Sequence, residues 1–228
     1  MQSFQGRGAG SLAATAREIQ LRMRDRCGCG QGGKTAGIRI IGGADAAYAG
    51  ENGIGVVTLF SYPELEPADY AIAVRRVLFP YVPGLFACRE LPLCLAACEK
   101  LTIRPDLLLF NGHGYAHPHR FGMACHAGAL LGIPSIGVAT RPLSGQSADP
   151  DRSRGSCAPL LDGGEVVGMA VRTREGSRPV YVSAGYRTGL SFAVEITLTT
   201  TRDRRMPVPL HAADLLARDY RRQNLFVL

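Results

Sequence analysis

The sequence contains no apolar run long enough to cross a bilayer, and its first ten residues lack the apolar core of a signal peptide. The seven cysteines show no usual zinc spacing, since Cys27 and Cys29 are separated by a single residue. The others lie mainly in apolar surroundings, where a free cysteine behaves as a small hydrophobe. The sequence also has no internal repeat. These absences predict a reduced, cytoplasmic protein that has no membrane partner and no thiolate-bound metal.

The net charge of +7 is concentrated at the two ends of the chain. Residues 1–37 have a net charge of +4 and residues 202–228 of +3, whereas residues 38–201 are neutral overall. A basic surface of this kind suits a polyanion such as nucleic acid. A pair of solvated, arginine-rich ends would carry the same charge, and charge alone leaves both interpretations open. We expect a monomer that needs no obligate protein partner.

The length of 228 residues suits one α/β domain, and we predict a short segment before it. Residues 1–37 are expected to form a basic helix, with Ser11 as its N-cap and its end at Cys27, followed by a Gly-rich linker. The linker ends in a Gly-Gly-Lys-Thr sequence that is similar to part of a phosphate-binding loop. Neither the strand before such a loop nor the helix after it is indicated here. Residues 38–228 are expected to form the main domain.

The pattern after residue 37 predicts a mixed sheet that is flanked by helices. Three strands joined by short turns predict an antiparallel meander, and buried apolar runs predict parallel strands after it. The expected strands are 38–45, 53–62, 70–78, 107–110, 133–139, 165–173 and 178–184, of which the last two form a hairpin. The expected helices are 91–101, 121–131, one that starts at 190, and 211–222.

Three polar residues are expected close to the sheet, where open α/β sheets hold their ligands. Asp45 ends the first strand, and a buried carboxylate there needs a partner, a metal or a solvent-filled cleft. Asn111 ends the strand at 107–110. Pro92 favours a helix start near Leu91, which puts Glu90 at the helix N-terminus. Two acids and an amide could hold Mg²⁺ for phosphodiester hydrolysis. A surface acid and a polar loop are the alternative interpretation.

Four sequence blocks occur in an order and spacing that resemble the endonuclease V family, also called deoxyinosine 3′-endonuclease. The blocks are Ile41–Asp45, Pro80–Gly84 together with Arg89-Glu90, Asn111–Pro118 and Ile136–Ala139. The resemblance extends from about Ile38 to Arg222, and it implies a ribonuclease H-like fold for a catalytic domain. It also implies a DNA-repair endonuclease. Such an enzyme would use Mg²⁺, or Mn²⁺ in its place, to cleave the second phosphodiester bond 3′ of inosine in DNA or RNA.

The resemblance implies a role for each matching residue. Asp45 and Glu90 match metal-binding acids, with Asn111 as a third ligand, and His117 matches a histidine near the active site. Arg141 follows Thr140, where the family usually has lysine, and could supply that charge, so that His117 or Arg141 would stabilise the phosphate in the catalytic site. Tyr81 matches a wedge that separates the strands beside the lesion. The expected nucleic-acid-binding residues are Pro80, Tyr81, Val82, Pro83, Gly84, Gly112, His113, Gly114 and His126. For His126, a hydrogen-bonded core histidine is the alternative, because it lies beside the apolar face of its helix.

The chain departs from the family pattern at three positions, one within these blocks and two outside them. Asn111 stands where the family has aspartate, Thr140 where it usually has lysine, and Tyr186 where histidine is more usual. A unit charge about 4 Å from a cation is worth on the order of 4 kcal/mol at an effective dielectric of about 20. Asn111 therefore weakens a metal site. Two hypotheses follow: an active nuclease, or an impaired relative that binds nucleic acid without efficient cleavage.

Overall fold

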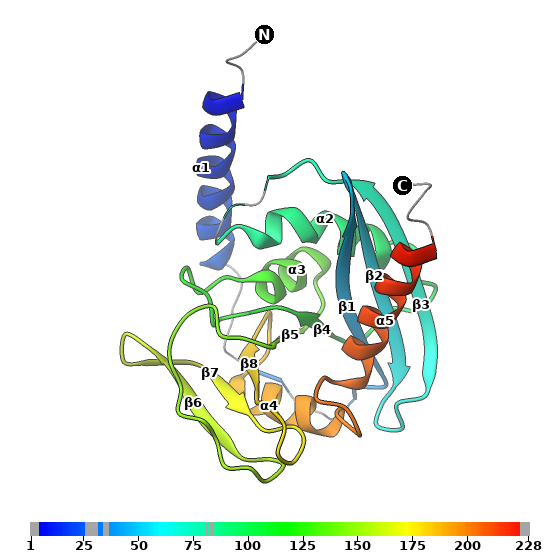
Figure 1. The fold of residues 1–228 in the computed structure, drawn as a ribbon, viewed down its shortest axis with the longest axis vertical. Coiled ribbons are helices and arrows are strands. Elements are labelled where there is room, and N and C mark those ends of the chain that lie inside the picture. The colour runs from blue at the N-terminus through cyan, green and yellow to red at the C-terminus, as the bar shows by residue number, and fades with distance from the viewer. Residues whose placement is uncertain (1–4, 26–31, 34–36, 81, 83, 224–228) are drawn as a thin grey trace.

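The computed structural model describes residues 5–25, 32–33, 37–80, 82 and 84–223 (Figure 1). One eight-stranded mixed sheet runs through the molecule in the order β3-β2-β1-β4-β5-β8-β7-β6. Its strands are β1 (Ile40–Ala49), β2 (Asn52–Ser61), β3 (Pro67–Arg76), β4 (Leu107–Asn111), β5 (Ser135–Ala139), β6 (Cys157–Asp162), β7 (Glu165–Val171) and β8 (Val180–Ala184). Its helices are α1 (Gln5–Arg24), α2 (Phe86–Cys98), α3 (Met123–Leu131), α4 (Leu190–Thr199) and α5 (Val208–Gln223).

The predicted mixed sheet is confirmed. Strands β1, β2 and β3 form an antiparallel meander, and β1, β4 and β5 are parallel to one another. The predicted hairpin of β7 and β8 is also antiparallel, and β8 joins it to β5. Strand β6 was not predicted, because its sequence includes Pro159 and its apolar residues do not alternate with polar ones. It adds the last strand at one edge of the sheet.

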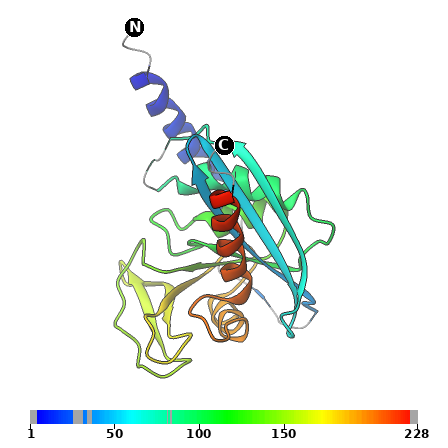
Figure 2. The same cartoon turned by 45° about the vertical axis from the view of Figure 1, so that its right-hand side comes forward.

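Helices cover both faces of the sheet (Figures 1 and 2). On one face, α2 and α3 pack on the meander and β4 through a core that includes Leu59, Phe110 and Leu91. On the other face, α4 and α5 pack through a second core around Ile41 and Leu109. Apolar residues alternate between these cores along β4, which is the two-residue period of a strand that is buried on both faces.

Helix α2 begins at Phe86, so the predicted start near Leu91 is wrong. Pro92 lies inside the helix, where it removes one backbone hydrogen bond. Burial of Leu91, Leu93 and the small residues after them against the sheet offsets that loss. Glu90 is therefore held on a formed helical turn and is not at the helix terminus.

Other boundaries also differ from the sequence-based expectations. Helix α1 begins at Gln5 rather than at Ser11, and α5 begins at Val208, with Pro209 in its first turn, where proline is tolerated. Strand β1 continues to Ala49, so Asp45 does not end it. The expected linker lies mainly outside the described residues, and the boundary at residue 37 stays a prediction. None of the described helices is long and apolar enough to span a membrane.

Helix α1 projects from one end of the molecule, and only its last turns reach the rest of the chain (Figures 1 and 2). Gln20 donates a 2.7 Å hydrogen bond from Nε2 to the carbonyl oxygen of Phe121. Met23 packs against the same residue and Cys125. Leu12 and Ile19 are about half exposed, so the apolar side chains of α1 are covered mainly near Met23.

Candidate functional site

Asp45 and Asn111 lie at the point where β1 and β4 separate. The parallel pairing of the two strands ends at Ala44 and Phe110, and the two polar residues follow directly on each strand. Asn111 Nδ2 donates a 3.1 Å hydrogen bond to Asp45 Oδ1, and the backbone N–H of Ala46 donates to the same oxygen. Asp45 is 9% exposed. The structure therefore brings these two predicted ligands together, with Asp45 in the middle of its strand.

Glu90 lies on α2 and is oriented by a residue of β1. The hydroxyl group of Tyr48 donates a 3.1 Å hydrogen bond to Glu90 Oε1. The guanidinium group of Arg89 lies 4.5 Å from the centre of the Tyr48 ring, and its Nη1 donates to the carbonyl oxygen of Phe79. These contacts fix the Glu90 side chain, which is 6% exposed. Neither Tyr48 nor Arg89 had been predicted as part of the site.

Burial shifts the ionisation of both carboxyl groups. It raises the pKa of Glu90 to about 8, and the charge of Asp45 adds to this shift. Burial also raises the pKa of Asp45 to about 6, against the opposing hydrogen bonds from Ala46 and Asn111. Two buried carboxylates that disfavour each other's charge are stabilised by a cation between them. The electrostatics of the cluster therefore fit a divalent metal ion.

A further acid, Asp214 on α5, contributes charge at this site. Its negative charge raises the pKa of Asp45, and Arg218, which forms a 2.7 Å ion pair with Asp214, lowers it. Among the described residues, no three histidine, cysteine, aspartate or glutamate side chains gather closely enough to hold a metal. The close donor set is two carboxylates and the amide of Asn111. Oxygen donors of this kind suit Mg²⁺ or Mn²⁺.

Close backbone packing places α5 beside β1. A Cβ atom on Gly43 would lie 2.3 Å from the carbonyl carbon of Pro209, so only glycine permits this approach. Thr58 on β2 donates a 2.8 Å hydrogen bond to the carbonyl oxygen of Pro209. No sequence motif marks Asp214. In the sequence, the one indication of its position is that it directly follows Ala213, a residue of α5 that is buried against the sheet.

A pocket of about 500 Å³ lies next to the acid cluster along the chain. Two of its lining residues are neighbours of the acid cluster in the sequence. Gly112 directly follows Asn111, and Ala87 lies three residues before Glu90 on α2. The lining residues are Val82, Gly84, Phe86, Ala87, Gly112, His113, His117, Met123, Arg141, Pro142 and Leu143. Six of these were predicted as site residues, and the five that were not are Phe86, Ala87, Met123, Pro142 and Leu143.

The two histidines of the pocket are neutral at neutral pH. Burial lowers the pKa of His113 to about 4, and its Nε2 lies 3.0 Å from the carbonyl oxygen of Arg141, which requires the ring proton on Nε2. Burial, helped by nearby His119 and His113, also lowers the pKa of His117 to about 4. The backbone N–H of His119 donates to His117 Nδ1 over 3.1 Å. The histidines can therefore offer hydrogen bonds but no charge.

The other described residues that were predicted to bind nucleic acid do not line the pocket. Gly114 packs against the backbone of Ala184, where a Cβ atom would lie 2.1 Å from the carbonyl oxygen. His126 is buried on α3, with its ring centre 5.4 Å from that of Phe121. Pro80 is exposed. The predicted wedge Tyr81 and its neighbour Pro83 lie outside the described residues.

Comparison with known proteins gives consistent matches. The family model described as Endonuclease V matches residues 23–215. Endonuclease V of Roseiflexus sp. (strain RS-1) is 47% identical over 180 residues, which are 79% of this chain and 81% of that protein. The crystal structure of Streptomyces avermitilis endonuclease V has a TM-score of 0.88 at 40% identity, and covers 92% of this chain and 93% of its own. That likeness confirms the predicted ribonuclease H-like fold.

A more distant structure carries a bound nucleic acid. Ciona intestinalis endonuclease V was solved in complex with a 24mer DNA that contains an inosine followed by a ribo-adenosine. It has a TM-score of 0.79 at 24% identity, and covers 94% of this chain and 99% of its own. At that identity the likeness concerns the fold.

Proposed function

Because this chain belongs to the endonuclease V family, whose members are phosphodiester hydrolases, we propose that it is a metal-dependent nuclease specific for inosine. It would cleave the second phosphodiester bond 3′ of a deoxyinosine or inosine, as a step in DNA repair. The bound inosine DNA of the Ciona intestinalis relative supports this substrate class. A single chain carries both the acid cluster and the pocket, so the activity needs no second subunit.

One observation carries this proposal: the buried acid cluster and the pocket adjoin at the end of β4, where Asn111 is followed by Gly112. Burial raises the pKa of both Asp45 and Glu90. A cation bound between the two carboxylates would stabilise their ionised forms. The pocket has room for a purine base and is lined mainly by apolar and glycine residues. A base seated in this pocket would leave its sugar–phosphate chain beside the acids.

Asp45, Glu90 and Asn111 would hold the Mg²⁺ ion, or Mn²⁺ in its place. The ion would polarise the scissile phosphate and lower the pKa of a bound water. Tyr48 keeps the Glu90 carboxylate in place, and the backbone N–H of Ala46 does the same for Asp45. The chain therefore supplies fixed oxygen donors in a site that is largely closed to water.

The remaining proposed residues bind and orient the nucleic acid. An extruded base leaves a gap in the stack that a side chain has to fill, and we assign this role to Tyr81 in the segment from Pro80 to Gly84. The neutral rings of His113 and His117 favour an uncharged base. Arg141 is exposed at the rim of the pocket, and it is the cationic lining residue that can meet a phosphate.

A catalytically impaired relative is the second candidate, and one contact favours it. Asn111 points its amide nitrogen at Asp45, so it donates to an oxygen that a metal ion would bind. An aspartate at this position could not donate, and it would add a negative charge to the site. Such a protein would bind inosine-containing nucleic acid and cleave it slowly.

A cleavage and binding assay separates the two candidates. Purified protein is incubated with a labelled deoxyinosine duplex and with an inosine-containing single-stranded RNA, first in Mg²⁺ and then in Mn²⁺. An active enzyme would cleave one nucleotide 3′ of the inosine, and Asp45→Ala would abolish the cleavage. An impaired relative would bind without cleavage in either metal. Equal binding to strands with and without inosine would overturn both candidates.

A further inference from the structure

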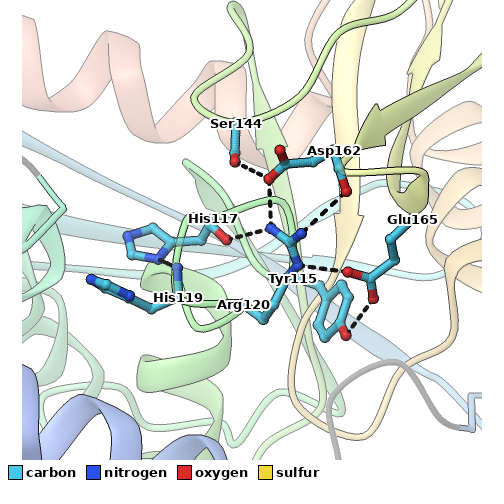
Figure 3. Close-up of polar contacts among 7 residues, drawn as sticks. All are labelled: Tyr115, His117, His119, Arg120, Ser144, Asp162 and Glu165. Carbon is cyan, nitrogen blue, oxygen red and sulfur yellow. Dashed lines mark hydrogen bonds and ion pairs between the residues drawn. The ribbon is translucent and has the colours of Figure 1, made fainter.

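Arg120 connects three segments around the pocket through its guanidinium group (Figure 3). Its Nε donates to Glu165 over 2.8 Å, and its Nη1 donates both to Asp162 over 2.7 Å and to the carbonyl oxygen of His117 over 3.1 Å. Its Nη2 donates to the carbonyl oxygen of Asp162 over 3.4 Å. The side chain is 21% exposed. All three nitrogens of the group are therefore engaged by protein atoms.

The charge of Arg120 is neutralised within the protein. It forms ion pairs with Asp162 at the end of β6 and with Glu165 at the start of β7. Arginines that bind a phosphate backbone direct a free positive charge at it. Arg120 faces two carboxylates instead, so its contacts organise the protein and are not directed at a phosphate.

On one side, Arg120 fixes the loop that carries His117. Its backbone N–H donates a 2.8 Å hydrogen bond to the carbonyl oxygen of His117, and the side chain donates to the same oxygen. The φ angle of Arg120 is +53°, where glycine or asparagine is less strained. The backbone conformation thus disfavours arginine at this position, and the hydrogen bonds of its side chain are what favour it. Tyr115 ties the same loop to the β6–β7 turn by donating a 2.7 Å hydrogen bond to Glu165.

On the other side, the network reaches the pocket wall formed by Arg141, Pro142 and Leu143. Ser144, the next residue, donates a hydrogen bond from its hydroxyl group to the same Asp162 oxygen that accepts from Arg120. The C-terminal end of the wall is therefore linked to the β6–β7 turn through one shared carboxylate.

The N-terminal end of this wall, at Arg141, is bonded directly to His113, on the segment between β4 and α3. His113 donates from Nε2 to the carbonyl oxygen of Arg141 over 3.0 Å. Pro142 and Leu143 thus lie between two fixed points, one at His113 and one at Ser144. Removal of the Arg120 side chain would leave Asp162 without its ion pair, and the Ser144 end would lose its link through Asp162 to the loop that carries His117.

We propose that Arg120 is a positioning residue that sets the shape of the pocket, and thereby its preference for a deaminated base. This inference rests on the proposed function of the pocket as a base-binding site. Arg120 does not line the pocket, and its side-chain hydrogen bonds go to residues outside the acid cluster. It acts by connecting the loop that carries His117 with the pocket wall formed by Arg141, Pro142 and Leu143.

Binding of two matched oligonucleotides tests this proposal. One fluorescent single strand contains a deoxyinosine, and the other contains deoxyadenosine at the same place. The reference protein carries Asp45→Ala, so that the strands stay intact in Mg²⁺, and its preference is the ratio of the two Kd values. We expect Arg120→Gln to reduce this preference about tenfold, which corresponds to the loss of one charge-assisted hydrogen bond. The Kd for the adenosine strand should stay within about twofold.

Two further variants and a melting curve complete the test. Arg120→Lys keeps the charge but not the planar fork, so its preference should be intermediate. Arg76→Gln is the matched control, because Arg76 is exposed and forms a surface ion pair with Glu51. It removes the same charge and should keep the full preference. A lowered Tm with unchanged preference in Arg120→Gln, or an equal loss of affinity for both strands, would overturn the proposal. A reference protein without any preference would overturn the proposed function itself.

Discussion

The amide nitrogen of Asn111 donates a hydrogen bond to Oδ1 of Asp45 over 3.1 Å, at the place where β1 and β4 separate. This contact stabilises the buried Asp45 carboxylate without a metal ion. It also uses one of the oxygens that a metal ion would bind. An aspartate at this position would repel Asp45 and create a stronger need for a cation.

We therefore expect Asn111→Asp to strengthen metal binding and cleavage. A third carboxylate near a divalent cation is worth up to about 4 kcal/mol before its desolvation is counted, so cleavage should rise roughly 10- to 100-fold. The measurement is the single-turnover cleavage rate of a deoxyinosine strand as a function of Mg²⁺ concentration. Asp45→Asn with Asn111→Asp is the matched control, because it keeps the wild-type charge. An equal rate in Asn111→Asp and the wild type would show that the charge at this position does not limit cleavage.

In metal-free protein, the free energy of unfolding is expected to fall as the pH rises from about 4.5 to about 8. Burial and the charge of Asp45 raise the pKa of Glu90 from 4.5 to about 8, and burial raises that of Asp45 from 3.8 to about 6. Between these values the folded chain holds protons that the unfolded chain has released. The stabilisation is complete below the unfolded pKa and is lost as the pH rises through the folded one.

Glu90→Gln should remove most of this pH dependence. At about pH 9 the variant should be more stable than the wild type by on the order of 2 kcal/mol, and near pH 4 the two should be similar. Chemical unfolding of chelator-treated protein at both pH values measures the difference. Glu99→Gln, which changes an exposed acid just after the same helix, is the control and should follow the wild type. A constant difference across the range would contradict the assigned pKa of Glu90.

Tyr48→Phe should weaken metal binding without unfolding the protein. The variant loses the hydrogen bond that holds Glu90 Oε1, and loss of such an orienting contact costs about tenfold in metal affinity. Titration calorimetry with Mn²⁺ measures the effect. Tyr62→Phe removes a comparable hydrogen bond to Thr199, remote from the acids in the fold, and should leave the affinity unchanged. Equal Mn²⁺ affinities in Tyr48→Phe and the wild type would show that Tyr48 does not position the carboxylate.

Gly43→Ala should destabilise the fold by about 2 kcal/mol or more, because a backbone atom of Pro209 occupies the space that the new methyl group needs. Gly112→Ala is the matched comparison, since its Cβ atom would meet Met123 at an ordinary 3.6 Å. It should retain nearly the wild-type stability in chemical denaturation. Similar losses in both variants would contradict the role given to the contact of β1 with α5.

The strand pattern was sufficient to predict the mixed sheet, because apolar period and turn residues are local properties of the sequence. The start of α2 could not be obtained in this way. The local rule for Pro92 is overridden by the burial of Leu91 and Leu93 against a sheet that forms from distant segments. Strand β6 was missed for a related reason, since its pairing with β7 satisfies the backbone despite Pro159.

The residues of the candidate site also fall into those that the local sequence predicts and those that depend on the packing of distant segments. Asp45 and Asn111 could be found because each follows a run of mainly apolar residues in the sequence, and Glu90 because its block resembles a known family. Asp214 could not be found, because its place near Asp45 depends on the packing of Pro209 against Gly43. The role of Arg120 was also hidden, since its partners lie on a turn after the strand that was not predicted.

Asn111 and Gly112 are consecutive in the chain, and one contributes to the acid cluster while the other lines the pocket. Under the proposed function, the single peptide bond between Asn111 and Gly112, at the end of β4, thus sets the distance between the recognised base and the bond that is cut. Its length is set by covalent geometry and does not change when flanking loops move. An extra residue at this point would alter the cutting position, whereas insertions in the β6–β7 turn would alter only which base is accepted.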